Sequence, residues 1–144
     1  MADVSAPEIR EAYNKVRSDK DETNWMLIDY EDDKSSKLVL TATGSGGLDE
    51  VKDKFQDDKA SFAYVRVKYS NDVESFREKF ILITYIGSSV KVMRRAKVSV
   101  QAADVKKTLG FYSIDVAASS KDDIKESEIV SRLRKAGGAS YDRA

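Results

Sequence analysis

The chain has 144 residues, close to the size of one ordinary domain, and 41% of them are hydrophobic, which is enough to build one core. It contains no cysteine and no histidine, which excludes disulfides, thiolate and histidine metal sites, and the catalytic arrangements that depend on these side chains. Acidic and basic residues balance at 25 each, so the whole molecule has no net attraction for nucleic acid or an anionic membrane, and an electrostatic partner must meet a local patch.

The first predicted element is a helix over residues 5–18. Ser5 can cap it, and Pro7 lies in its first turn, where a missing backbone N–H is harmless. One apolar stripe follows at helical spacing: Ile9, Ala12, Tyr13 and Val16. Residues 24–30 and 37–43 then predict two strands, which the polar turn between them joins into an antiparallel hairpin.

The glycine-rich segment at residues 44–47 invites a phosphate-binding interpretation. A phosphate loop ends in Lys-Ser or Lys-Thr at the start of a helix. Here the glycines lead instead into Asp49 and Glu50, whose carboxylates would repel phosphate. We therefore interpret the segment as a flexible connector, followed by a short helix over residues 48–55.

Two strongly β-prone segments come next, residues 61–69 and 79–86, separated by a polar segment. The second is almost continuously apolar, which predicts a central strand covered on both faces. Residues 88–109 then predict a long helix, which Gly110 ends. One face of this helix collects residues at spacings of three and four: Met93, Ala96, Val100, Ala103 and Lys107. Residues 111–116 predict the last strand.

A final helix is predicted from a cap at Ser119 or Ser120 to the glycine pair at 137–138. The whole order is helix, two strands, helix, two strands, long helix, strand, helix. This order predicts an α+β domain with α/β/α layers, in which helices cover both faces of a mixed sheet. We assign residues 1–136 to this single domain and residues 137–144 to a flexible C-terminal tail.

Most other conspicuous side chains have an ordinary structural interpretation. Core packing is predicted for five aromatic residues on apolar faces: Tyr13, Trp25, Phe80, Tyr85 and Phe111. Arg66 and Lys68 alternate with apolar neighbours and are predicted to lie on a solvated strand face. The carboxylate pairs lie in turns or at helix starts, where they increase solubility and do not form a general acid and base.

Four segments form a recognisable set: AYNKVR at 12–17, KFILITYIG at 79–87, RAK at 95–97 and the ending KAGGASYD at 135–142. Together they resemble the coactosin branch of the actin-depolymerising-factor/cofilin homology family, over nearly the whole chain. The ending in particular distinguishes coactosins from cofilins proper. The resemblance implies the fold of that family, the actin-depolymerising-factor homology fold, with a central five-stranded mixed sheet flanked by helices on both faces.

The resemblance also implies filamentous actin as the partner and no enzymatic activity. In this family the long helix is laid against actin, and the lysine that matches Lys79 is tied to filament binding. Where cofilins carry a lysine-methionine pair in the long helix, this chain has Arg95 and Ala96, which keep the charge but lose the large apolar side chain. This difference argues against strong monomer binding and filament severing. It fits the coactosin branch, and the resemblance to that branch implies a protein that prefers filaments to monomers, does not sever efficiently and can counteract capping of filament ends.

The region between Lys79 and Ala103 contains basic residues and no acidic one. Its basic residues are Lys79, Lys91, Arg94, Arg95 and Lys97. Such a run is most often a solvated helix face, and Lys79 alone would most often be a lysine that protects a strand edge. Because actin filaments are acidic and the family places this helix at the interface, we interpret the five residues as the actin-binding site.

Two other functions remain open from the sequence. One is a cofilin-like monomer binder and severing factor, and the other is a phosphoinositide-responsive protein that uses the same basic helix at a membrane surface. An enzyme is the least supported, since no nucleophile-base pair, metal cluster or phosphate loop is present, and no cofactor is expected. The longest apolar runs fall far short of the roughly 20 residues that span a bilayer, and the N-terminus does not resemble a signal peptide. We expect a monomer located in the cytoplasm and cytoskeleton.

Overall fold

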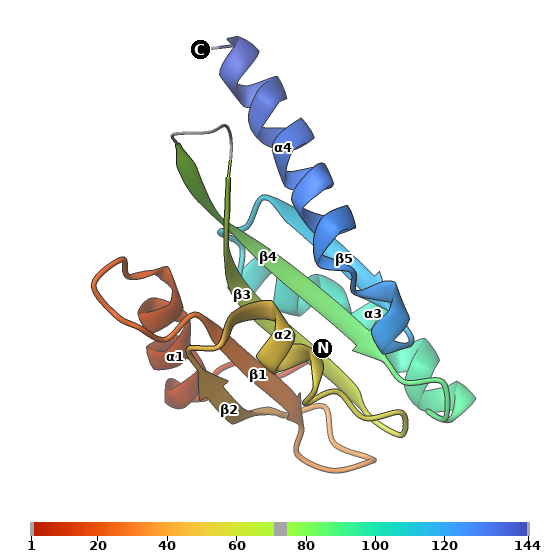
Figure 1. The fold of residues 1–144 in the computed structure, drawn as a ribbon. Coiled ribbons are helices and arrows are strands. Elements are labelled where there is room, and N and C mark those ends of the chain that lie inside the picture. The colour runs from red at the N-terminus through yellow and green to blue at the C-terminus, as the bar shows by residue number, and fades with distance from the viewer. Residues whose placement is uncertain (1, 71–74, 144) are drawn as a thin grey trace.

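The computed structural model describes the backbone of residues 2–70 and 75–143, and the side chains of the last helix as far as Ala136. Its strands form one sheet in the order β2-β1-β3-β4-β5. Neighbouring strands run antiparallel, except that β4 and β5 are parallel. Their bounds are β1 Trp25–Tyr30, β2 Leu38–Gly44, β3 Ala60–Ser70, β4 Phe76–Ile86 and β5 Ile114–Ala118. The predicted mixed sheet is therefore confirmed (Figure 1).

Helices cover both faces of this sheet (Figure 1). On one face, α1 (Pro7–Arg17) and α3 (Val92–Thr108) bury apolar side chains in a common core. On the other face, α2 (Gly47–Lys52) and α4 (Glu126–Arg143) contribute to a second core, and a short 3-10 turn, η1 (Lys121–Asp123), precedes α4. The α/β/α layering predicted from the element order is confirmed.

The apolar run of β4 is explained by these two cores. Ile81 and Ile83 are fully buried on the side of α2 and α4, while Leu82 between them is fully buried on the side of α1 and α3. Because successive side chains of a strand point to opposite faces, a strand covered on both sides must be apolar at nearly every position. The prediction of a central covered strand is confirmed.

β3 and β4 continue beyond the sheet as a two-stranded projection, seen at the top of Figure 1. Residues 66–70 and 76–80 pair with each other, whereas β1 pairs with β3 only as far as Val65 and β5 pairs with β4 only from Ile81. We call this part the β3–β4 extension. β4 therefore begins before Lys79, and the predicted strand start at that residue is wrong. One side of this ribbon is covered, since Val67 and Tyr69 are buried in the core on the side of α4. Ser70, Phe76 and Glu78 are exposed, so the sequence there lacks a continuous apolar run.

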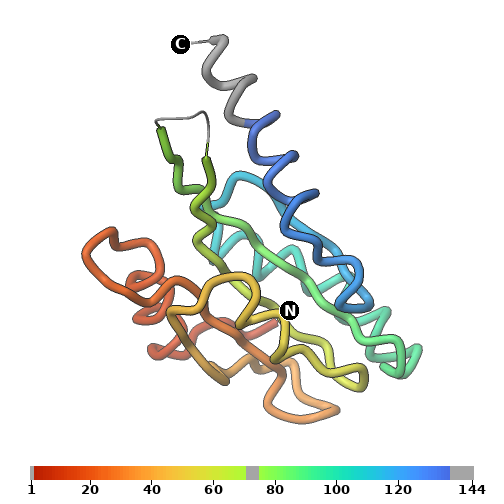
Figure 2. The backbone as a smooth tube through the Cα atoms, viewed as in Figure 1, coloured from red at the N-terminus to blue at the C-terminus, as the bar shows by residue number. Residues whose placement is uncertain are grey.

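The extension and the last helix lie side by side, as the tube in Figure 2 traces. Arg134 of α4 donates hydrogen bonds to the carbonyl oxygen of Ser70 at 3.2 and 2.7 Å. Nearer the sheet, the Arg132 guanidinium donates to the carbonyl of Asp115 at 3.0 Å. Arg132 and Arg134 therefore bind α4 to the sheet and to the extension.

The start of the first helix differs from the prediction. Ala6 occupies the N-cap position, and the Ser5 hydroxyl and backbone N–H both donate to the carboxylate of Asp3. Ser5 therefore does not cap the helix, whereas Pro7 does lie at its first position as predicted. Asp3 competes successfully for the serine because its carboxylate is a charged acceptor only two residues away.

The last helix also differs at both ends. The Asp123 carboxylate accepts backbone N–H bonds from Ser119 and Ser120, and this arrangement closes the 3-10 turn, so α4 itself begins only at Glu126. The helix continues past residues 137–138, so the predicted stop at the glycine pair is wrong. The expectation that residues 137–144 form a flexible tail outside the domain is a separate matter and stays a prediction.

The aromatic residues predicted for the core divide into two groups. Tyr13, Trp25 and Tyr85 are buried, as predicted, and Phe80 is half-buried. Phe111, however, is 55% exposed, because β5 begins three residues later and leaves it in the connection from α3. Its backbone is held by hydroxyl groups of two buried tyrosines: its N–H donates to Tyr13, and its carbonyl accepts from Tyr64.

Candidate functional site

The long helix α3 buries one face and exposes the other. Val98, Ala102 and Val105 pack against the sheet. The predicted set of Met93, Ala96, Val100, Ala103 and Lys107 does share one face, and that face points to solvent. Met93 is 84% exposed and Val100 is 76% exposed. We call these five residues the exposed face of α3. Large apolar side chains gathered on a solvated helix face are typical of a binding surface.

Cations lie on both sides of this apolar face. At about 100° per residue, Arg95 falls on one flank of the helix and Lys97 on the opposite flank. Both side chains are exposed, and Lys91 is exposed at the N-cap of the helix. The Arg95 guanidinium lies 3.3 and 3.4 Å from the carbonyl oxygens of Ser88 and Val90 in the preceding loop. An apolar centre with a basic rim matches an apolar surface that has acidic surroundings.

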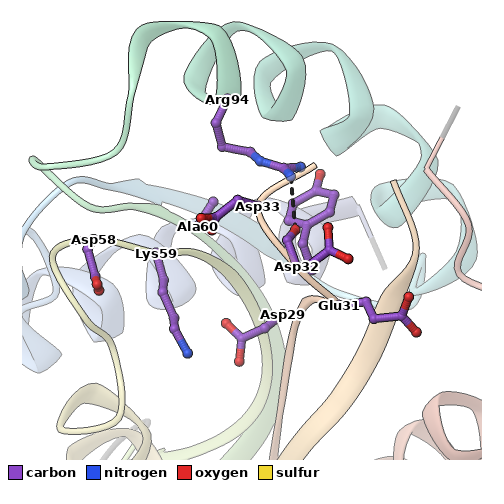
Figure 3. Close-up of a pocket in the computed structure, with 9 residues that line it drawn as sticks. Asp29, Glu31, Asp32, Asp33, Asp58, Lys59, Ala60 and Arg94 are labelled. Atoms are coloured by element: carbon purple, nitrogen blue, oxygen red, sulfur yellow. Dashed lines mark hydrogen bonds between the residues drawn. The ribbon is translucent and has the colours of Figure 1, made fainter. Parts of the chain in front are cut away.

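Arg94 points in a different direction from these cations. Its guanidinium donates one hydrogen bond to the carbonyl oxygen of Ser35 at 2.9 Å and another to that of Asp32 at 3.0 Å. It also lies 4.5 Å from the centre of the Tyr30 ring. Figure 3 shows Arg94 reaching from α3 to the β1–β2 loop, with the Asp32 contact as a dashed line. The side chain is half-buried, and both terminal nitrogens of its guanidinium donate a hydrogen bond within the protein.

Lys79 belongs to another surface altogether. It pairs with Val67 in the β3–β4 extension, and its side chain follows the same side of β4 as Ile81 and Ile83, the side covered by α4. α3 packs against the opposite face of the sheet. The structure therefore does not bring the five predicted residues together: it divides them between α3 and the extension.

Two features of the extension were absent from the sequence-based site. Phe76 is 65% exposed at the start of β4, and the Lys68 ammonium lies 5.5 Å from the centre of its ring. Nothing in the sequence indicated this pair, since Phe76 lies in the polar segment between the two predicted strands and Lys68 was predicted only to lie on a solvated strand face. The exposure of Met93 and Val100, by contrast, could have been found, because α3 carries a second apolar set, including Val98 and Val105, that fits the buried face better.

Arg66 was predicted to lie on a solvated face, and this prediction is wrong. Its guanidinium donates to the carbonyl oxygens of Ser18, Asp21 and Thr23 at 2.6, 2.8 and 3.0 Å. Its Nε also lies 3.6 Å from the carboxylate of Glu78 in the extension. The side chain is mostly buried because the connection between α1 and β1 folds over it. Arg66 therefore has a structural role.

The described part of the chain holds no group of three or more histidine, cysteine, aspartate or glutamate residues placed to bind a metal ion. A cavity of about 310 Å³ beneath the β1–β2 loop is lined by five carboxylates and two cations, several of which appear in Figure 3. They are Asp29, Glu31, Asp32, Asp33, Asp58, Lys59 and Arg94. The carboxylate of Asp29 already accepts hydrogen bonds from Thr41 and Ser61, and Arg94 is bound to the loop.

Across residues 2–70 and 75–143, no helix combines the length and the apolar character needed to cross a membrane.

Comparison with known proteins identifies the class to which this fold belongs. The family model for cofilin/tropomyosin-type actin-binding proteins matches residues 1–134, so the chain belongs to this actin-binding family. Its similarity lies with the coactosins. Coactosin from Dictyostelium discoideum is 39% identical over 142 residues, covering 98% of this chain and 95% of that protein. Coactosin from Entamoeba histolytica is 37% identical over the same length and with the same coverage.

Solved structures agree with this assignment. The crystal structure of Entamoeba histolytica coactosin has a TM-score of 0.82 at 33% identity and covers 94% of both chains. Mouse coactosin, described as an actin filament binding protein, has a TM-score of 0.75 at 32% identity, covering 99% of this chain and 96% of that one. The predicted resemblance and the actin-depolymerising-factor homology fold are confirmed. This protein is an actin-binding protein of the coactosin type, from a family without enzymatic activity.

Proposed function

We propose that the protein binds actin filaments in preference to actin monomers, with the exposed face of α3 as the main contact and Lys79 as a second one. The observation that carries the proposal is the exposure of Met93 and Val100 between the flanking cations Arg95 and Lys97. A large apolar side chain that moves from water into a packed interface contributes about 1.5 to 3 kcal/mol. A partner that covers exposed apolar side chains of this size therefore binds more tightly.

The preference for filaments is supported by the separation of the two surfaces. α3 packs on one face of the sheet, and the side chain of Lys79 follows the other. A partner that contacts both surfaces must reach around the molecule or supply two copies of itself. A filament offers two or more neighbouring actin subunits to one molecule, whereas an actin monomer offers a single subunit. The name of the mouse relative, an actin filament binding protein, points in the same direction.

We extend the proposal to inefficient severing and to the ability to counteract capping of filament ends. Both are implied by the resemblance to coactosins. Inefficient severing is also supported by Ala96, which provides little apolar surface at the place where cofilins have methionine. The protein would act as a monomer in the cytoplasm, on the cytoskeleton. Cofilin-like monomer binding with severing remains the competing function, because the same exposed face of α3 could serve it.

Co-sedimentation with filaments, combined with single-filament microscopy, tests the proposal. We expect the protein to pellet with filaments, to bind monomers much more weakly, and to leave filament length unchanged over minutes. The matched pair of variants is Lys97→Ala at the proposed surface and Lys15→Ala on α1, both exposed lysines on helices. Only Lys97→Ala should weaken pelleting. Rapid severing together with tight monomer binding would favour the cofilin-like function instead.

A further inference from the structure

The contacts of Arg94 give it a role different from that of its neighbour Arg95. Its Nη1 donates to Ser35 and its Nη2 to Asp32, so two nitrogens of one planar fork grip two carbonyl oxygens of the same loop. The ring of Tyr30 lies against the guanidinium at 4.5 Å. A lysine cannot reproduce this combination, because its ammonium is a compact charge without a plane or a fork. The contact therefore depends on arginine as such, and not only on positive charge.

The loop that receives Arg94 is itself well ordered. The Asp32 carboxylate accepts the backbone N–H groups of Lys34 and Ser35, both at 2.8 Å, which closes a tight turn. This turn sets the directions of the two carbonyl oxygens before Arg94 binds them. The conformation of the loop is thus fixed, so a side chain of α3 that binds the loop holds α3 in place.

Two further contacts hold the same flank of α3. The Gln101 side-chain amide donates to the Ser36 hydroxyl at 2.9 Å, and Asp104 accepts the backbone N–H of Ala2 at 2.9 Å. Arg94 and Gln101 are two turns apart and therefore lie on one side of the helix. Arg94 is the contact nearest the start of α3, where Met93 begins the exposed face. Its loss would release the turn that carries Met93 more than any other part of the helix.

We propose that Arg94 is a positioning residue, which holds the first turn of α3 on the β1–β2 loop so that the exposed face of α3 meets actin in one orientation. This inference rests on the proposed function, since it assumes that α3 contacts actin. Arg94 acts from the side of the helix and does not touch the partner. If only a fraction of molecules has α3 in the binding orientation, the apparent affinity falls by that fraction.

The first experiment compares two arginine-to-lysine variants that are neighbours in the chain. Arg94→Lys keeps the charge but loses the fork and the stacking, so filament affinity should fall by about tenfold, through a smaller competent fraction. Arg95→Lys keeps the charge of an exposed residue at the proposed surface, so its filament affinity should fall much less than that of Arg94→Lys. Affinity is measured by co-sedimentation at two salt concentrations, and a thermal melt confirms that both variants are folded. The salt dependence of Arg94→Lys should equal that of the parent.

The second experiment approaches the same contact from Tyr30, which lies on β1, away from the exposed face of α3. The Tyr30 hydroxyl is buried and has no hydrogen-bond partner among the described residues, so Tyr30→Phe, which keeps the ring, should leave filament binding unchanged. Tyr30→Leu removes the ring that stacks on Arg94 and should weaken filament binding. Combined with Arg94→Lys, it should add no further loss, because both changes disrupt one contact.

A third measurement needs no actin and separates the two proposals. Hydrogen exchange at the backbone N–H groups of residues 95–98 should be faster in Arg94→Lys than in the parent. One of these groups is the N–H of Arg95, which donates a hydrogen bond to the carbonyl oxygen of Lys91. Unchanged exchange, or parent-like binding by Arg94→Lys, would overturn the positioning role. If exchange is faster but Val100→Asp and Lys97→Ala both bind like the parent, the positioning of α3 stands as a structural fact and the proposed actin surface fails.

A direct contact of Arg94 with actin gives a different pattern. In that case Arg94→Lys would bind like the parent, and Arg94→Ala would reduce the salt dependence of binding in the way that Lys97→Ala does. Independent, additive losses from Tyr30→Leu and Arg94→Lys would also contradict the inference. Each of these outcomes assigns Arg94 to the interface and removes it from the support of α3.

Discussion

The exposed face of α3 and the β3–β4 extension are both basic, but they present charge in different ways. On α3 the cations lie beside an apolar centre on a helix that packs against the sheet through Val98, Ala102 and Val105. On the extension, Lys79 is a half-buried charge on a ribbon that projects beyond the sheet. An apolar centre can exclude water from an interface and so supply affinity. A single charge at a distance from it adds selectivity, because it is satisfied only if a second group is correctly placed.

The largest expected effect comes from breaking the apolar centre of α3. Val100→Asp places a carboxylate where the proposed interface is dry, which should cost about 3 kcal/mol or more of binding free energy, roughly a hundredfold in affinity. Because Val100 is solvent-exposed in the free protein, the fold should be retained. Co-sedimentation gives the affinity and a thermal melt gives the stability. A folded Val100→Asp variant that pellets like the parent would remove α3 from the interface.

An effect of similar size is expected at the extension. Lys79→Ala should abolish or severely reduce filament binding, since truncating one partner of a desolvated charge pair costs about 2 to 5 kcal/mol, which can erase micromolar binding. The matched control is Lys68→Ala, in the same extension but on the opposite side of the ribbon, for which we expect a much smaller loss. The measurement is again co-sedimentation, with circular dichroism as the test of folding. If folded Lys79→Ala pellets normally, α3 must carry the interaction alone.

A smaller effect concerns the dependence of filament binding on ionic strength. Contacts made by exposed Arg95 and Lys97 are screened over about 8 Å at physiological salt, so filament affinity should fall as salt rises. The double variant Arg95→Ala, Lys97→Ala should show a flatter dependence on salt, whereas Val100→Asp should keep the dependence of whatever binding remains. Pelleting of the parent that does not change from low to high salt would contradict a basic rim around the apolar face.

The smallest effect is expected at alkaline pH and concerns the support of α3. Burial raises the pKa of Tyr30 to about 12, with Arg94 opposing the shift. In the unfolded chain this phenol ionises near pH 10. The stabilisation from the raised pKa is therefore complete below pH 10 and is lost as the pH rises towards 12. Denaturant unfolding from pH 9 to 11 should show a steeper loss of stability for the parent than for Tyr30→Phe, and equal losses would contradict the burial of the hydroxyl.

The sequence predicted the fold well because its signals are local and repeated. The continuous apolar run of β4 can only be a strand covered on both faces, and the structure buries Ile81, Leu82 and Ile83 completely. The end of the extension, at residues 70 and 76–78, was missed for the opposite reason, whereas residues 66–69 and 79–80 lie in the predicted strands. Only Val67 and Tyr69 of the extension are buried in a core, and the pairing of its end is satisfied by the two strands themselves, so the polar residues around Ser70 and Phe76 carry no strand signal.

The candidate site could be predicted only as a set of residue types. Arg94 and Arg95 are neighbours with the same chemistry. The helix rotates by about 100° from one residue to the next, so Arg94 points towards the β1–β2 loop and Arg95 stays at the surface. The sequence near Arg94 does not predict that its acceptors are the carbonyl oxygens of Asp32 and Ser35, which belong to a loop about sixty residues earlier in the chain. Likewise the division between α3 and Lys79 follows from the pairing register of β4, which residue types do not determine.

Arg66 has a consequence for how the molecule opens. The connection from α1 to β1 is held at Ser18, Asp21 and Thr23 by this one guanidinium, which also faces Glu78 in the extension. Connections of this kind usually fray on their own, at little free-energy cost. Here fraying would strip a mostly buried cation of its acceptors, so the connection and the base of the extension should open together, as one cooperative unit. A protease that needs an unfolded substrate should therefore find no early cleavage site at Lys20, although that lysine lies exposed on the surface.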